Sequence, residues 1–205
     1  MQQKLKRFLI LGLLILLGIS IVLFIRQRTK LNTSRVAVIK EMRALQRLET
    51  ASFTIEKIID ARTTEGNAFQ EFLFGDKLLL IAHGEIIAGF DLRKLTENNV
   101  TVKGETLQIA LPAPEILVVR IDNEKTRVYD RSSGIFSKGE RDLESDARLQ
   151  AEEQILLAAC EGGILTQATE NAQKQFGNFF KTFGFKDVEI TAPQGVCNKP
   201  TVTVQ

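Results

Sequence analysis

The sequence predicts an α+β protein: an N-terminal transmembrane helix, then a mostly antiparallel sheet with C-terminal helices packed on one face. Two patterns predict the folded part. Apolar residues alternate between about residues 52 and 130, which is typical of strands, and recur at helical intervals between about 142 and 183. Strands that precede helices along the chain favour an antiparallel sheet with its helices on one side.

The first 30 residues carry a membrane signal. Residues 8–25 contain no charged side chain. Basic residues stand on both sides of this run, namely Lys4, Lys6, Arg7, Arg26, Arg28 and Lys30. A helix rises about 1.5 Å per residue, so the run nearly crosses a hydrocarbon core about 30 Å thick. No small-residue cleavage site comes after it, so we expect an uncleaved, single-pass signal anchor rather than a removed signal peptide.

The side of the membrane is harder to predict. Basic residues flank both ends of the anchor in similar number, so the positive-inside rule does not decide. A short basic tail before an apolar run is typical of segments that export the domain C-terminal to them, which favours an extracytoplasmic domain. Cys160 and Cys197 leave the question open, because a disulfide suits an oxidising compartment and two free thiols suit a reducing one.

Charge is distributed unevenly along the chain. The net charge is +2, but from Glu49 onward 17 basic side chains stand against 24 acidic ones, a balance of −7. We expect membrane lipid to contact residues 8–25 and the basic stalk after them. The acidic part shows no basic face interleaved with aromatic residues, so we expect no nucleic-acid partner. A protein partner or a second copy of the chain remains a candidate.

These signals divide the chain into five segments. They are a basic tail at 1–7, the anchor at 8–25, a basic juxtamembrane helix or linker at 26–50, an α+β domain at 51–191 and a tail at 192–205. Within the domain we expect strands at about 52–130, helices at about 142–183 and a last strand at 187–191. Val38, Met42, Leu45 and Leu48 recur at helical intervals in the linker.

Two apolar stripes mark the C-terminal helices, and Gly162 and Gly163 should break the helix between them. We expect both stripes to pack on the sheet. The first comprises Ala147, Ala151, Ile155 and Ala158, and the second Leu165, Ala168, Ala172, Phe176, Phe179 and Phe183.

The only histidine of the chain lies in "KLLLIAHGEIIAGFDL", which reads as one strand. Its even-numbered residues from Leu78 to Leu92 are almost all apolar and form a core face. His83 and Glu85 share the opposite face, about 7 Å apart along the strand. This pair is either a structural hydrogen bond or an acid–base group. Asp91 lies further along the same face.

Other polar residues on later strands are candidates for a cluster near His83. They are Arg120, Asp122, Arg127, Tyr129 and Asp130. The sequence has no GxSxG elbow, no phosphate-binding glycine loop and no HExxH. One histidine and two distant cysteines do not complete a zinc site. We therefore predict no cofactor, no metal and no assigned catalytic residue, and keep His83, Glu85 and Asp91 as candidates.

Three motifs occur in a fixed order: "EFLFGDKLLLIAHGEIIAGFDLRKL", "LPAPEILVVRIDNEKTRVYDRSSGIF" and "AEEQILLAACEGGILTQATENA", and "FGFKDVEI" comes after them. Together they resemble the bacterial membrane-anchored family known as domain of unknown function 4230, over roughly residues 54–190. The resemblance implies a single anchor and one α+β domain. It implies no activity, cofactor or catalytic residue.

The sequence therefore favours a non-enzymatic, membrane-anchored module that binds protein or lipid. The alternative is a membrane-tethered, hydrolase-like enzyme that uses His83 with Glu85 or Asp91.

Overall fold

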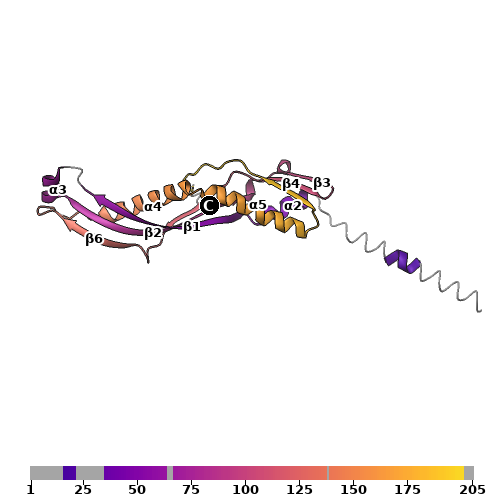
Figure 1. Ribbon diagram of the computed structural model, residues 1–205, viewed down its shortest axis with the longest axis horizontal. Helices are drawn as coiled ribbons and strands as arrows, with labels where there is room; N and C mark the ends of the chain where they lie inside the picture. Colours follow the sequence, from indigo (N-terminus) through magenta and orange to yellow (C-terminus); the bar gives the residue numbers. More distant parts are fainter. Residues whose placement is uncertain (1–15, 22–34, 64–66, 138, 201–205) are drawn as a thin grey trace, which may run out of the picture.

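The computed structural model describes residues 16–21, 35–63, 67–137 and 139–200. The described domain is elongated: the short helix α3 (Ala68–Phe74) lies at one end and α2 (Arg35–Ala44) lies toward the other (Figure 1). A long sheet and a small sheet each pack against helices and have a separate apolar core. The predicted α+β class, with helices after strands, is confirmed.

The long sheet is built around one central strand. Its members are β1 (Arg47–Arg62), β2 (Asp76–Asp91), β5 (Glu115–Ile121) and β6 (Arg127–Ser133). One edge of β2 pairs with β1 over its whole length, and the other edge pairs with β5 and with β6, one after the other. Each pairing is antiparallel, as predicted. Residues 122–126 loop out between β5 and β6, opposite His83, whose carbonyl accepts a bond of 2.8 Å from the Asp122 amide.

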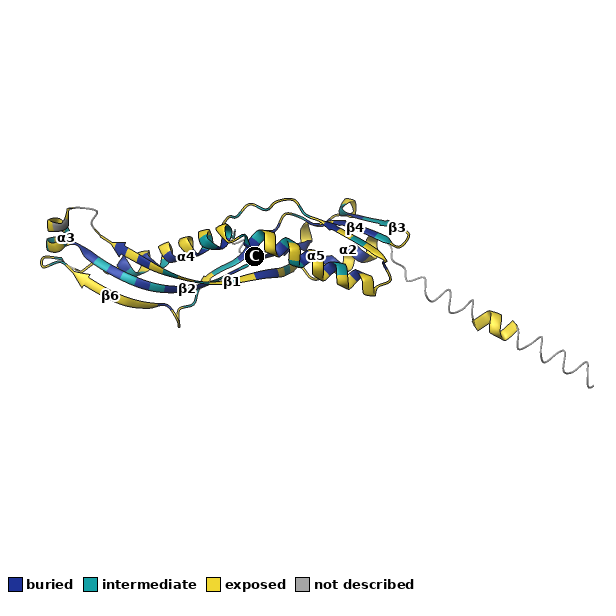
Figure 2. Ribbon diagram, viewed as in Figure 1, coloured by how far each residue is buried: buried dark blue, intermediate teal, exposed yellow. Residues whose placement is uncertain are grey.

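The two faces of β2 differ as strand alternation predicts. The predicted core face is fully buried, at Leu78, Leu80, Ala82, Ile86, Ala88 and Phe90. Gly84 belongs to this face because a Cβ there would lie 2.9 Å from the Ile155 side chain. The opposite face, which carries His83 and Glu85, is half-buried (Figure 2). The long sheet therefore exposes one face and buries the other.

Two helices cover the buried face, α4 (Leu143–Glu161) and α5 (Ile164–Thr182). They are separated by Gly162 and Gly163, as predicted. Gly163 has a φ of 75°, a left-handed conformation that glycine adopts without a steric penalty.

The buried residues of each helix recur every four positions. In α4 they are Leu143, Ala147, Ala151, Ile155 and Ala159, and in α5 they are Ile164, Ala168, Ala172, Phe176 and Phe180. The predicted stripes are wrong at four positions: Ala159 is buried in place of Ala158, Ile164 in place of Leu165, and Phe180 in place of Phe179 and Phe183. Four residues turn a helix by about 40° more than one full turn, so a four-residue stripe winds around each helix as it follows the twisted sheet.

The domain has a second sheet, where the sequence predicted only one. β3 (Val100–Lys103) and β4 (Thr106–Ala110) form a hairpin, and β7 (Asp187–Thr191) joins β4 in parallel. A parallel partner requires a long crossover, which α4 and α5 supply here. The small sheet, α2 and the second half of α5 enclose the second core, in which Val38, Ile39 and Met42 of α2 are buried.

Most of the predicted anchor at 8–25 lies outside the described residues. Residues 16–21 form helix, and their large apolar side chains are exposed. Among the described residues, no helix is long and apolar enough to cross a membrane. The anchor stays a prediction.

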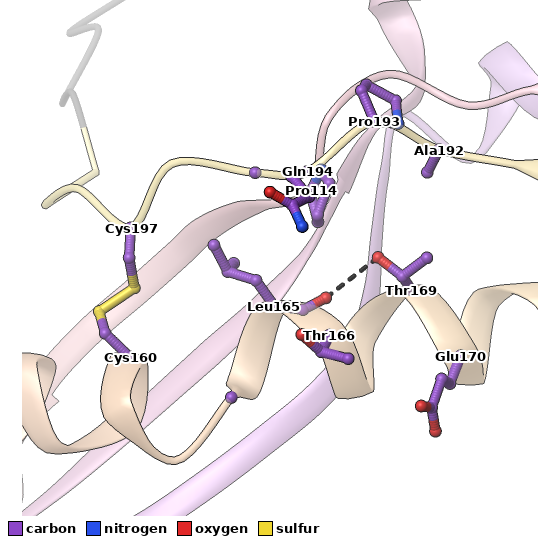
Figure 3. Close-up of a pocket in the computed structure, with 12 residues that line it drawn as sticks. Pro114, Cys160, Leu165, Thr166, Thr169, Glu170, Ala192, Pro193, Gln194 and Cys197 are labelled. Carbon is purple, nitrogen blue, oxygen red and sulfur yellow. Dashed lines mark hydrogen bonds between the residues drawn. A yellow bond between two sulfur atoms is a disulfide. The ribbon is translucent and has the colours of Figure 1, made fainter.

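A disulfide joins Cys160, near the end of α4, to Cys197 in the C-terminal tail, with the Cα atoms 5.9 Å apart. The sequence left this pairing open. The bond fastens the segment from Ala192 to Pro200 along the outside of the domain, where it runs past the start of α5 (Figure 3).

Candidate functional site

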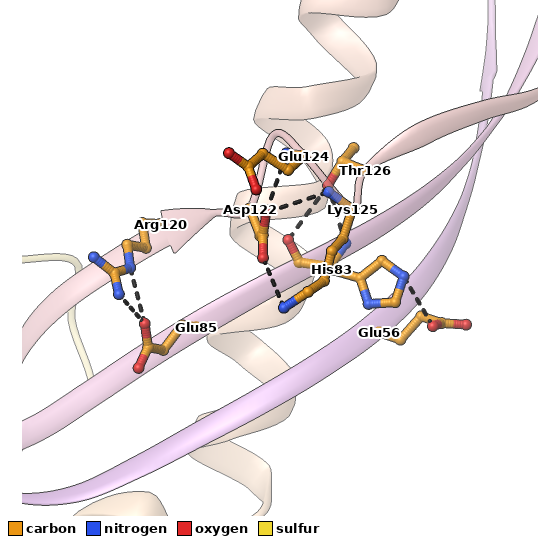
Figure 4. Close-up of polar contacts among 8 residues, drawn as sticks. All are labelled: Glu56, His83, Glu85, Arg120, Asp122, Glu124, Lys125 and Thr126. Carbon is orange, nitrogen blue, oxygen red and sulfur yellow. Dashed lines mark hydrogen bonds and ion pairs between the residues drawn. The ribbon is translucent and has the colours of Figure 1, made fainter.

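His83 lies on the half-buried face of the long sheet and bonds to a neighbouring strand. Its Nε2 lies 3.0 Å from Glu56 Oε2, and the two residues are directly opposite each other in the β1–β2 register (Figure 4). The His83 side chain is 26% exposed and that of Glu56 is 57% exposed. The partner of the histidine is therefore a carboxylate on β1, which sequence spacing within β2 could not identify.

Glu85 points the same way but has other partners. Its Oε2 accepts a bond of 2.8 Å from Arg120 Nε, and its Oε1 accepts one of 3.2 Å from the Ser52 hydroxyl. The bond from Arg120 is the main cause that lowers the pKa of Glu85, and the bond from Ser52 lowers it further. A carboxylate held ionised in this way is poorly suited to donate or exchange a proton near neutral pH.

Asp91 does not approach His83. Eight residues of strand separate them, about 26 Å at about 3.3 Å per residue. Asp91 is buried and binds the Arg93 guanidinium through both carboxylate oxygens, each bond being 2.9 Å, and it caps the turn at Leu92–Lys94. The bonds from Arg93 lower the pKa of Asp91. The His83–Asp91 pair of the enzymatic alternative is therefore not assembled in this structure.

The later polar candidates also separate into local contacts. Arg120 binds Glu85, and Asp122 binds Lys125 Nζ at 3.0 Å within the 122–126 loop. The Lys125 ammonium lowers the pKa of Asp122. Within the described part of the chain, the side chains of Arg127, Tyr129 and Asp130 on β6 make no hydrogen bond or ion pair, and all three are exposed. The candidates do not converge on one point.

A cavity of about 370 Å³ lies under the disulfide-bonded tail (Figure 3). The tail, the start of α5 and Pro114 form its walls. Thr169 lines it, but its hydroxyl already donates to the Leu165 carbonyl at 3.0 Å. Glu170 is the only carboxylate among the residues that line this cavity. Over the described residues, no group of three or more His, Cys, Asp or Glu side chains could hold a metal ion.

A cluster of exposed apolar side chains gathers at the α3 end of the molecule, and we call it the aromatic tip. It comprises Phe69, Phe72, Phe74, Ile135 and Phe136, which are between 56 and 69% exposed. The Phe74 and Phe136 rings lie 6.0 Å apart. Soluble domains rarely gather so many exposed bulky residues without a binding role. This site was not predicted from the sequence, although "AFQEFLF" places three phenylalanines in seven residues.

Backbone contacts hold the tip in one shape. The Asn67 side chain caps α3 by accepting a bond of 3.0 Å from the Gln70 amide. The amides of Gly134, Ile135 and Phe136 donate to carbonyls of α3 or of Gly75 at 2.8, 3.3 and 2.8 Å. A Cβ on Gly134 would lie 2.7 Å from the Phe74 nitrogen, so only glycine permits this approach.

Charged side chains behind the tip are paired. Arg62 lies 2.8 Å from Asp60 and 3.1 Å from Glu71, and Lys77 lies 3.6 Å from Asp60. Buried Asp76 accepts a bond of 2.5 Å from the Glu140 amide, which is the main cause that lowers the pKa of Asp76. These residues therefore leave no cluster of unpaired charges of one sign at the base of the tip.

The model of the family described as "Protein of unknown function (DUF4230)" matches residues 40–190. No curated protein and no solved structure matches the chain. The match covers both sheets and both long helices.

Proposed function

The chain belongs to the DUF4230 family, whose description names no activity, and we propose that it is a membrane-anchored, non-enzymatic interaction module. The observation that carries this proposal is the aromatic tip. Five bulky apolar side chains are held out into solvent by a capped helix and three backbone hydrogen bonds. Because exposed apolar surface is unfavourable in water, a fold that builds such a surface is best explained by a partner that covers it.

The contacts of the sequence-predicted residues support a non-enzymatic role. A general base needs a free acceptor within reach of a reacting group, and a nucleophile beside it. His83 is bonded to Glu56, and Glu85 is bonded to Arg120 and Ser52. The enzymatic alternative pairs His83 with Glu85 or Asp91, and in this structure these two carboxylates are bonded to Arg120 and Arg93 instead.

We further propose that residues 8–25 anchor the chain and that the domain lies on the extracytoplasmic side. The uncharged run and its basic flanks support the anchor. The Cys160–Cys197 disulfide supports the side, because such bonds persist in oxidising compartments and are rare in the reducing cytosol.

The test is chemical capture of neighbours from native membranes with three full-length chains. They are the wild type, Phe69→Ser/Phe72→Ser, and the control Leu149→Ser/Leu157→Ser, whose leucines are 58% exposed on α4. We expect a set of neighbours, protein or lipid, that only the tip variant loses. Identical capture by all three chains would contradict a binding role for the tip.

A further inference from the structure

We propose that the partner of the aromatic tip is a lipid surface of zwitterionic headgroups, and that an anchored chain thereby bridges two membranes. This inference rests on the proposed function and names the partner of the same site. Three properties of the tip lead to it: its area, its charge and its position.

The five side chains of the tip alone present less area than a stable protein interface buries on one partner. A fully exposed aromatic side chain presents about 200 Å². At 56 to 69% exposure the five side chains together present roughly 600 Å². A stable interface buries about 800 Å² on each partner and needs a matching shape. A lipid surface makes no such demand, because acyl chains adapt to whatever enters them.

The side chains of the tip suit insertion into lipid. Phe69, Phe72 and Phe74 extend from one short helix, and the backbone of residues 134–136 is bonded to that helix, so both segments enter together. The rigid shape also lowers the entropic cost of binding, since the side chains are already presented before contact.

The charge around the tip argues against an anionic surface. Arg62 is paired with Asp60 and Glu71, and Lys77 lies 3.6 Å from Asp60. The chain from Glu49 onward carries a balance of −7. Anionic headgroups would repel a domain of this charge, whereas zwitterionic headgroups would not.

The position of the tip indicates which of two membranes it contacts. The tip lies at the opposite end of the elongated domain from α2, the first described helix after the predicted anchor (Figure 1). A domain held at its α2 end presents the tip away from the membrane that holds it. We therefore infer that the tip meets a second lipid surface.

Tryptophan fluorescence can test this directly, because the natural sequence contains no tryptophan. The probes are Phe72→Trp in the tip and Leu157→Trp on α4, which replace side chains 62 and 58% exposed. Each full-length chain is placed in donor vesicles of phosphatidylcholine. Protein-free acceptor vesicles of brominated phosphatidylcholine, which quenches tryptophan on contact, are then added.

We expect acceptor lipid to quench the Phe72→Trp probe at least about fivefold more than the Leu157→Trp probe. Adding Phe69→Ser and Phe136→Ser to the tip probe should remove the difference. Acceptors that contain one-third anionic lipid should quench less at low salt. Equal quenching of both probes would overturn the proposal, as would stronger quenching with anionic acceptors.

Two further experiments distinguish a failure of this inference from a failure of the proposed function. Quenching only when bromine is placed in the donor lipid would put the tip on the anchoring membrane and overturn the bridging claim. Clustering that requires protein in both sets of vesicles, without quenching, would show that the tip meets a second copy. That result would contradict the lipid inference but leave the interaction module intact.

Discussion

At the scale of single residues, His83 and Glu85 show what strand alternation can predict and what it cannot. Strand alternation correctly placed His83 and Glu85 on the same face, away from the core. The actual partners, Glu56 and Arg120, come from the two neighbouring strands. Which residue lies opposite another depends on strand register, and one sequence does not contain the register of strands that are far apart along the chain.

The His83–Glu56 pair gives a stability prediction. Because Glu56 is 57% exposed, its carboxylate remains hydrated when the histidine is removed. We therefore expect His83→Gln and His83→Ala each to change the free energy of unfolding by less than about 1 kcal/mol. Urea unfolding of the two variants measures this. A loss above about 2 kcal/mol in both would show that His83 holds the sheet together.

Asp76 gives a prediction about pH. The Glu140 amide donates to its carboxylate and lowers the pKa of Asp76 below the ordinary value of 3.8. A carboxyl whose pKa is lower in the folded state stabilises the fold above the unfolded-state pKa, and this contribution is lost as pH falls through the lower, folded-state value. The base of the tip should thus be unaffected between pH 7 and pH 5 and weaken below about pH 4.

The comparison is the melting temperature of the wild type and of Asp76→Asn as a function of pH. The difference between the two should be constant from pH 7 to pH 5 and should shrink in acid. A difference that is the same at pH 3 as at pH 7 would contradict an ionised role for Asp76.

At the scale of elements, strands and helices with a regular apolar period were predicted better than the pairing between strands. The 16-residue strand β2 and its core face were predicted because alternation is strict along it. The helix stripes were correct at most of their members and wrong at Ala158, Leu165, Phe179 and Phe183, since a four-residue repeat drifts around the helix. The helix α3 was missed because seven residues are too few to show a period, and its exposed phenylalanines imitate a buried segment.

The α5 stripe gives a matched pair of variants. Phe180 is 3% exposed in the second core, whereas its neighbour Phe179 is 45% exposed. We expect Phe180→Ala to cost about 3 to 5 kcal/mol of unfolding free energy and Phe179→Ala about 1 kcal/mol or less. Denaturant unfolding of both variants decides it. Equal losses of unfolding free energy in the two variants would contradict the four-residue stripe of α5.

At the scale of the whole molecule, a domain that carries the aromatic tip at one end is joined at its other end to a predicted anchor. The second sheet could not be predicted, because nothing in "KDVEI" indicates that β7 pairs with β4 rather than with the long sheet. The second core that results fixes α2 to the domain through Val38, Ile39 and Met42. The predicted stalk is thus a rigid part of the domain from Arg35 onward.

The anchor itself is tested by extraction. Full-length chain in native membranes should stay in the pellet after treatment with alkaline carbonate, which releases peripheral proteins but not membrane-spanning ones. Replacing Leu14 and Leu17 by lysine in the middle of the apolar run should shift the chain to the supernatant, because a charge at the bilayer centre costs about 2.5 to 3.5 kcal/mol. Release of the unmodified chain would show that residues 8–25 do not span the membrane.

Site-specific photocrosslinking in native membranes tests whether the aromatic tip is the binding surface of the molecule. Benzoylphenylalanine would replace Phe72 or Phe136 in the tip, and Tyr129 or Leu157 outside it, all of them more than half exposed. We expect adducts with lipid or protein at Phe72 and Phe136 and at most traces at Tyr129 and Leu157. Adducts concentrated at Tyr129 or Leu157, or none at any of the four positions, would contradict a binding role for the tip.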